Sequence, residues 1–165
     1  MTRHAIRFIR LKQEILSELA QLDALEMELA QIEERGDSLP NPARVRALAS
    51  ILHDFYTGCE RIFERVAQEF DGGLPSDSSW HSRLLEAMTL DLPAVRPPVI
   101  HKETARILQD YLAFRHRFRR MYGFELDENK LAPLLRMMGQ AKNVLKTDVM
   151  RFIAHQEEVF SDGLK

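Results

Sequence analysis

The residues of this chain that are best suited to chemistry lie in one short segment, residues 114–122, with the sequence FRHRFRRMY. Four arginines fall within six residues there, although the whole chain has 23 Lys and Arg against 25 Asp and Glu. An arginine fork can bind a phosphate through two hydrogen bonds and stabilise the charge of a pentacoordinate transition state. A histidine that titrates near neutrality can take the proton of a ribose 2′-hydroxyl or protonate the leaving oxygen. These residue types indicate a phosphodiester-cleaving site that uses no metal.

The spacing of these residues predicts where they lie on a helix. Two neighbouring stripes have steps of four and three: one is apolar (Ile107, Tyr111, Phe114, Phe118, Met121), and the other turns from apolar to polar (Leu108, Leu112, Arg115, Arg119, Tyr122). Residues three and four apart share a helix face, so we expect Arg115, Arg119 and Tyr122 at the edge of buried surface, beside His116. A purely structural interpretation is also open, because the helix dipole favours arginines near a helix C-terminus by about 0.3–1 kcal/mol each.

Five amphipathic helices are predicted to position this segment. Apolar residues at steps of three and four predict helices over residues 3–35, 42–70, 77–90, 100–122 and from 128 onward. Gly36 is the expected C-cap of the first helix, and Asn41 and Asp127 are expected N-caps. Short connections between long helices predict an all-α fold, an antiparallel bundle of four to five helices with a long N-terminal helix. We expect a single helical domain over residues 1–165, with 1–36 as the first helix and 42–165 as the bundle that carries the arginine segment.

Composition narrows the class of protein. A net charge of −2 predicts no global attraction to nucleic acid or anionic membrane, so any site for a polyanion must be local. The single cysteine, Cys59, excludes an internal disulfide and favours a reducing cytoplasm, with Cys59 as a buried structural thiol. No run of 18 apolar residues predicts a membrane span, and no HxxxH, ExxH or paired-cysteine spacing predicts a metal site. We therefore expect a cytoplasmic protein without a cofactor.

Two further pairs lie outside the arginine segment. Glu60 and Glu64 are four residues apart and are expected on a mostly solvated helix face, although they could support the arginines across the bundle. Trp80 and His81 could line a cleft, but a tryptophan that packs into the core is the simpler interpretation.

The same residues resemble a known family. HEPN nucleases of the HepT-like group carry the pattern Arg–polar–x₃–His–x–Tyr late in a helix of an α-bundle. Arg115 matches the motif arginine, His116 the polar position after it, and Tyr122 the terminal tyrosine. Four further segments of the chain resemble one branch of the group: LHDFY at 52–56, ERIFER at 60–65, DGGLP at 71–75 and WH at 80–81. The resemblance extends from about residue 47 to the C-terminus, and more loosely over the first helix.

The resemblance implies the toxin of a toxin–antitoxin pair, a metal-independent ribonuclease that cleaves tRNA or mRNA. Arg115, His116 and Arg119 would be catalytic, and Arg117 and Arg120 would bind RNA. The usual motif histidine falls at position 120, which is Arg120 here, so His116 would take over the role of general base. The alternative is a site that binds RNA without cutting it.

The resemblance also implies partners. HEPN proteins pair as homodimers around a shared cleft, and the face of Leu108, Leu112, Arg115 and Arg119 is compatible with such pairing. A minimal nucleotidyltransferase antitoxin would attach AMP to Tyr122, which adds bulk and negative charge among arginines meant for RNA. A second function, from a different class, is a non-catalytic helical binding module or a scaffold for a nucleotidyltransferase partner.

Overall fold

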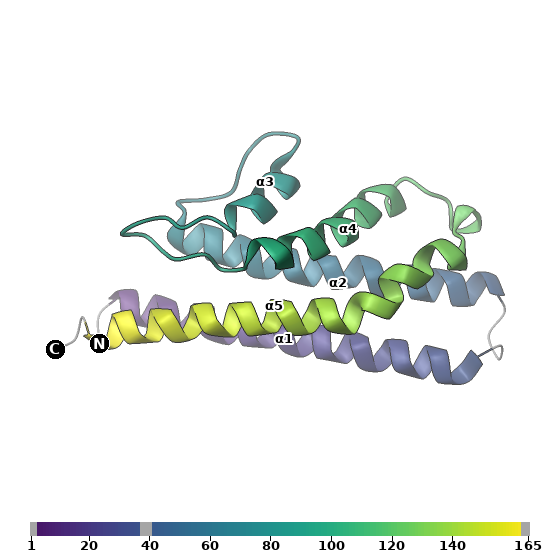
Figure 1. Ribbon diagram of the computed structural model, residues 1–165, viewed down its shortest axis with the longest axis horizontal. Helices are drawn as coiled ribbons and strands as arrows, with labels where there is room; N and C mark the ends of the chain where they lie inside the picture. The colour runs from purple at the N-terminus through teal and green to yellow at the C-terminus, as the bar shows by residue number, and fades with distance from the viewer. Residues whose placement is uncertain (1–2, 37–40, 163–165) are drawn as a thin grey trace.

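The structure is a computed structural model that describes residues 3–36 and 41–162. Within these residues there are five α-helices, one 3₁₀ turn and no β-strand. The elements are α1 (Arg3–Arg35), α2 (Asn41–Phe70), α3 (Trp80–Ala87), α4 (Lys102–Phe118), η2 (Gly123–Glu125) and α5 (Glu128–Asp162). Helices α1 and α5 lie side by side against one face of α2, and α3 and α4 cover its other face (Figure 1). The helix pairs α1–α2, α2–α4, α4–α5 and α1–α5 are antiparallel, whereas α2 and α5 run in the same direction. The expected all-α bundle with a long first helix is confirmed.

The apolar stripes of the sequence form the core. Ile15 of α1, Leu52 and Phe55 of α2 and Leu145 of α5 are fully buried, and each such side chain contributes about 1.5–3 kcal/mol relative to exposure. Cys59 is buried as expected, and this burial raises the pKa of its thiol. In the described part of the chain, no helix combines the length and the apolar character that crossing a membrane requires.

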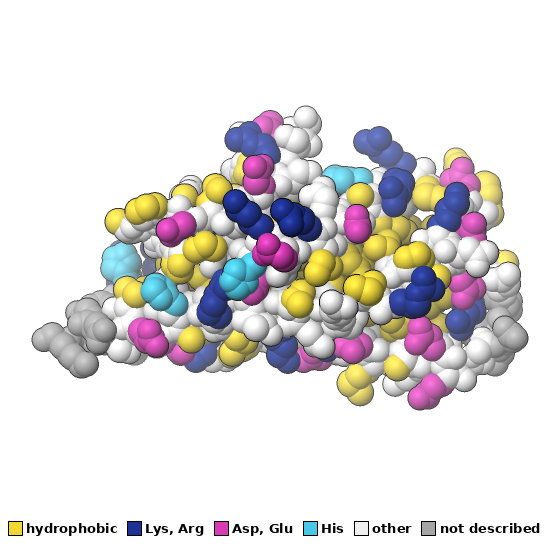
Figure 2. All heavy atoms as spheres, viewed as in Figure 1, with side chains coloured by type: hydrophobic (Ala, Val, Ile, Leu, Met, Phe, Trp, Pro, Cys, Tyr) yellow, Lys and Arg dark blue, Asp and Glu magenta, His cyan; other side chains and the backbone are white. Residues whose placement is uncertain are grey.

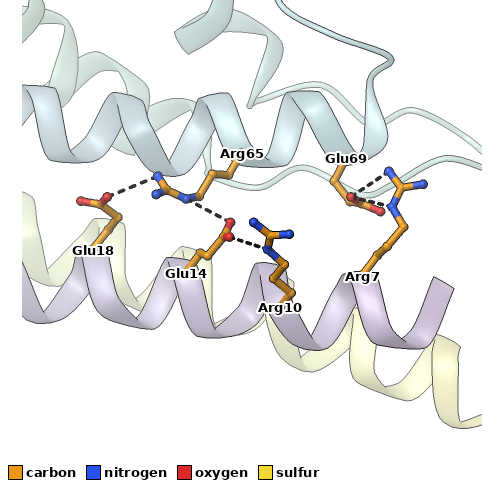
Figure 3. A network of polar contacts seen from close by, with 6 residues as sticks. All are labelled: Arg7, Arg10, Glu14, Glu18, Arg65 and Glu69. Carbon is orange, nitrogen blue, oxygen red and sulfur yellow. Dashed lines mark hydrogen bonds and ion pairs between the residues drawn. The ribbon is translucent and has the colours of Figure 1, made fainter. Parts of the chain in front are cut away.

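Ion pairs line the outer seam between α1 and α2 (Figure 3). Arg65 of α2 reaches Glu14 at 3.3 Å and Glu18 at 3.2 Å, and Arg7 of α1 binds Glu69 through two contacts of 3.2 and 3.0 Å. Glu18 is buried, but the other two pairs are partly exposed, and exposed pairs contribute about 0–1 kcal/mol each. The seam therefore helps to set the register of α1 on α2, while the apolar stripe supplies most of the stability.

Local signals set several helix ends. Gly36 has φ +52°, the left-handed conformation expected of a helix C-cap. Asp127 caps α5 as predicted, because its Oδ1 accepts the N–H of Asn129 at 3.0 Å. The N-cap prediction for Asn41 is wrong, since α2 already begins at that residue. Helix α3 is shorter than predicted, because Asp77 accepts the N–H of Ser79 at 3.0 Å and holds a turn before the helix.

Helix α4 ends at Phe118, four residues earlier than predicted. The N–H groups of Arg120 and Met121 bond back three residues instead of four, at 3.0 and 3.2 Å, which tightens the chain out of the α-helix. Tyr122 then has extended backbone (φ −74°, ψ 149°), and its N–H donates to the Glu125 carboxylate at 2.7 Å. Arg119 is the C-cap of α4, and its N–H still bonds back to the Arg115 carbonyl oxygen at 3.2 Å, but its side chain is exposed. Tyr122 lies beyond the helix and does not continue the second stripe.

The first turn of α4 is fixed by α5. Asp148 of α5 accepts the backbone N–H of His101 at 2.8 Å and the hydroxyl of Thr104 at 2.6 Å. Burial alone would raise the pKa of Asp148, but these hydrogen bonds outweigh it and the pKa is lowered. A carboxylate at the positive end of the helix dipole is stabilising, so Asp148 anchors the helix that carries the arginine segment.

Arg96 links the irregular segments before and after α3 through hydrogen bonds. Its side chain is 0% exposed and binds both oxygens of Asp71, at 2.6 and 2.7 Å. It also donates to the carbonyl oxygens of Ala87 at 3.0 Å, Leu90 at 3.2 Å and Pro97 at 3.3 Å. The stretch from 93 to 98, which contains three prolines, is not helical, and Arg96 holds it against the end of α2.

Candidate active site

Arg115 lies in the last turn of α4 and points onto α2. It is 4% exposed, which confirms the expected place at the edge of buried surface. Its Nη2 donates to Glu60 Oε1 at 2.9 Å, and its guanidinium carbon lies 5.3 Å from the centre of the Tyr56 ring. One nitrogen of the guanidinium is therefore occupied by a carboxylate of the same chain. Arg115 is not free to bind a phosphate through two hydrogen bonds as expected.

The other nitrogens of Arg115 differ in their surroundings. Its Nε is buried without a hydrogen-bond partner, as is the Tyr56 hydroxyl. Its Nη1 makes no hydrogen bond to the described residues and is not among the buried unpartnered atoms, so it keeps contact with solvent. Arg115 can thus present one N–H donor group to a ligand while Glu60 holds the other.

Glu60 joins α3 to this site. Its Oε2 lies 2.7 Å from His81 Nδ1, and the His81 ring stacks on Trp80 with the centroids 3.7 Å apart. Glu60 is buried, so its expected place on a solvated face is wrong. The reason is tertiary: α3 and α4 both cover this face of α2, where Arg115 compensates the charge of the carboxylate and His81 contacts its second oxygen.

His116 follows Arg115 and is exposed. Its ring meets the His81 ring edge to face, with the centroids 5.5 Å apart. Partial burial lowers the pKa of His116, and the positive charges of His81 and Arg115 lower it further. The neutral imidazole, which can accept a proton, is therefore favoured near pH 7.

The remaining arginines of the segment surround the end of α4. Arg117, Arg119 and Arg120 are all exposed, and Figure 2 shows basic side chains gathered over this end of the helix. Phosphate groups of a polyanion could contact all three from solvent. This local positive patch fits a chain whose overall charge is slightly negative.

Tyr122 lies beyond the helix. It is 70% exposed, and its ring stacks on Phe124, which is 78% exposed, with the centroids 5.2 Å apart and the planes at 7°. Its phenol is thus open to solvent on the turn that leads to α5, and it does not stack on the residues around Arg115.

The helix face suggested for dimer pairing is not free. Leu108 and Leu112 are buried inside a single copy of the chain, and Arg115 is held by Glu60. Only Arg119 of that face is exposed. A partner subunit would need other surface.

The sequence offered a site role for Glu60 and His81 only as an alternative, Glu60 as support for the arginines and His81 as a cleft residue. The contact of Glu60 with Arg115 bears out the first of these alternatives. Glu60 and His81 meet only because α2, α3 and α4 pack together, and no local spacing predicts that contact. Among residues 3–36 and 41–162, no three His, Cys, Asp or Glu side chains are grouped so that they could hold a metal ion.

Comparison with known proteins identifies the family. The family model of HepT-like proteins matches residues 47–156, two thirds of the chain, from the first third of α2 into the last turns of α5. No curated protein and no solved structure matches the chain. The matched range contains Glu60, His81 and the whole arginine segment. This chain belongs to the HepT-like family of HEPN proteins.

Proposed function

We propose that this protein is the toxin of a toxin–antitoxin pair, an endoribonuclease that cleaves tRNA or mRNA without a metal ion. The observation that carries the proposal is the pairing, at the solvent-facing end of α4, of a guanidinium with one free N–H donor group and an imidazole that favours its neutral form. Membership of a family that includes ribonuclease toxins supports the same reaction.

The arginines and the histidine of the arginine segment have separate roles in the proposed reaction. Arg115 Nη1 and Arg119 bind the scissile phosphate and stabilise the charge that develops on it. His116 takes the proton of the ribose 2′-hydroxyl, and the 2′-oxygen then attacks phosphorus. Arg117 and Arg120 bind neighbouring phosphates of the RNA backbone. His116 thereby takes the part of the histidine that the family pattern places at Arg120.

A cleavage assay in EDTA tests this function. We expect the purified protein to cut a tRNA or mRNA pool and to leave 2′,3′-cyclic phosphate ends. His116→Asn should reduce the rate by about 10²–10⁴-fold, the usual contribution of general acid–base catalysis. His155→Asn, an exposed histidine on α5, is the matched control and should cleave like the wild type. Full activity of His116→Asn, or no cleavage of any RNA by the wild type, would contradict the proposal.

We further propose that a nucleotidyltransferase antitoxin neutralises the toxin by attaching AMP to Tyr122. The exposed phenol is accessible to such an enzyme, whereas the other two tyrosines, Tyr56 and Tyr111, are buried. After incubation with the cognate transferase and ATP, intact-mass spectrometry should show added AMP on the wild type and none on Tyr122→Phe. AMP on the Tyr122→Phe variant would place the acceptor elsewhere.

Two observations favour a second function. Glu60 already occupies part of Arg115, and position 120 is an arginine, so the site could bind RNA or a nucleotidyltransferase without cutting. Such a module would bind labelled RNA through Arg117, Arg119 and Arg120 yet show no cleavage products in the same assay.

We also propose a homodimer, which analytical ultracentrifugation of the full chain would detect.

A further inference from the structure

A single carboxylate orients a second histidine in this site. Glu60 Oε1 accepts from Arg115 Nη2 at 2.9 Å, and Glu60 Oε2 lies 2.7 Å from His81 Nδ1. An ionised carboxylate only accepts hydrogen bonds, so the contact at 2.7 Å places a proton on His81 Nδ1. The approach of Arg115 Nη2 to the same Nδ1, at 2.8 Å, is then a contact between two donors that share Glu60 as their acceptor.

This arrangement directs the other ring nitrogen of His81 away from Glu60. Nε2 makes no hydrogen bond to the described residues and is not among the buried unpartnered atoms, so it reaches solvent. Trp80 holds the ring on its face, stacked at an interplanar angle of 29°. Rotation of the imidazole would break both the stack and the bond to Glu60. A carboxylate that fixes one ring nitrogen and leaves the other free is the usual device for an acid–base histidine.

Cleavage of an RNA linkage needs two proton transfers. The 2′-hydroxyl must lose a proton as it attacks, and the 5′-oxygen must gain one as it leaves. The structure offers two imidazoles for these proton transfers, His116 and His81. Their ring centroids lie 5.5 Å apart, beside Arg115. The role of proton acceptor suits His116, whose neutral form is favoured. The role of proton donor is then open for His81.

We propose that His81, positioned by Glu60, is the general acid of this site and protonates the 5′-oxygen of the leaving nucleoside. The inference rests on the proposed ribonuclease function. His116 takes the 2′-hydroxyl proton, the 2′-oxygen bonds to phosphorus, the bond from phosphorus to the 5′-oxygen breaks, and the Nε2 proton of His81 passes to that oxygen. The products are a 2′,3′-cyclic phosphate and a 5′-hydroxyl, and exchange with water restores both histidines. His81 is a catalytic residue in this step and Glu60 a positioning residue.

The pH dependence follows from these roles. A general base must be unprotonated, so activity rises with pH through the lowered pKa of His116. A general acid must instead carry its proton when it acts, which is the part given to His81. The charged groups that act on His116 come from all three packed helices: Glu60 from α2, His81 from α3, and Arg115 and Arg119 from α4. Tyr56 and Glu64 of α2 lie close to Glu60 and Arg115. Burial and the charge of Glu60 raise the pKa of Glu64.

A substrate that needs no general acid tests the role of His81. The probe is an oligoribonucleotide that the wild type cleaves, compared with the same oligonucleotide whose bridging 5′-oxygen at that linkage is replaced by sulfur. A thiolate leaves without being protonated. His81→Asn should therefore lose about 10²–10⁴-fold in kcat/KM on the oxygen linkage but less than about tenfold on the sulfur linkage. His116→Asn should lose activity on both, because each reaction needs the 2′-hydroxyl proton removed.

The pH profiles give a second readout. The wild type should gain activity as pH rises through the lowered pKa of His116; His116→Asn should lose this rise, and His81→Asn should keep it. Glu60→Gln should lower the rate on the oxygen linkage more than on the sulfur linkage, as a positioning residue would. His155→Asn is the control, thermal melting checks folding, and His81→Gln replaces His81→Asn if that variant does not fold.

Each outcome decides a separate point. If His81→Asn loses kcat/KM equally on both linkages, His81 has a structural role. If its rate on the oxygen linkage is unchanged, His81 has no role in the reaction. Either result overturns this inference while the ribonuclease function stands. A wild type that cleaves no RNA in EDTA overturns the proposed function itself, and the role of His81 with it.

Discussion

Replacing Arg115 by methionine should lower the free energy of unfolding by about 3–5 kcal/mol, the usual cost of removing one partner of a buried ion pair. The side chains of Glu60 and Arg115 are only 6% and 5% exposed, so the carboxylate left behind would stay desolvated without its cation. Methionine keeps most of the apolar stem that packs beside Tyr56, and the loss therefore reports mainly on charge. Chemical denaturation followed by far-UV circular dichroism measures it.

The double variant Arg115→Met/Glu60→Gln separates stability from catalysis. It should regain most of the lost stability, because no buried charge is left unpaired. It should not regain cleavage, because the guanidinium that binds the phosphate is still absent. Arg106→Met, an exposed position on the same helix, is the control and should change stability by no more than about 0.5 kcal/mol. A double variant as unstable as Arg115→Met would show that the ion pair is not the origin of the loss.

The second large effect is expected at Arg96. Arg96→Met should lower the free energy of unfolding by about 3–5 kcal/mol, because it leaves the Asp71 carboxylate and three carbonyl oxygens without their donor. The chain beside it is already strained, since Ala94 has φ +64° in the turn closed by the bridge from Leu92 to Arg96. Hydrogen exchange should accelerate over residues 71–79 and 88–101, which Arg96 links.

Arg83→Met is the matched control for Arg96. Arg83 also pairs with an aspartate, Asp77, but both side chains are largely exposed, at 59% and 45%. Exposed pairs contribute about 0–1 kcal/mol, so this variant should stay close to the wild type. Similar small losses in both variants would show that the burial of Arg96 does not make its contacts stabilising.

Family membership and helical class were readable from short-range patterns. The apolar residues of α1, α2 and α5 recur every three to four residues and most of them are buried, because such a face must pack against another helix. Gly36 and Asp127 act as the caps that their residue types predict, since capping depends on side chains and backbone within one turn.

The helical spacing of the sequence did not predict where α4 ends. Arg119 and Tyr122 continue the spacing of Leu108, Leu112 and Arg115, but the chain tightens after Phe118 and Glu125 captures the N–H of Tyr122. Periodicity shows which faces a helix would have, and it does not show where competing hydrogen bonds end that helix. Tyr122 consequently lies on an exposed turn.

The sequence by itself determined an all-α bundle, the family, and the cluster of Arg115 and His116 near the end of one helix. Only the tertiary structure decided that Glu60 is buried, that it binds Arg115 and His81 together, and that Arg96 holds the loops around α3. These contacts join residues 21 to 55 positions apart in the chain. No helical or turn spacing encodes such pairs, because they depend on which helix faces meet when the bundle closes.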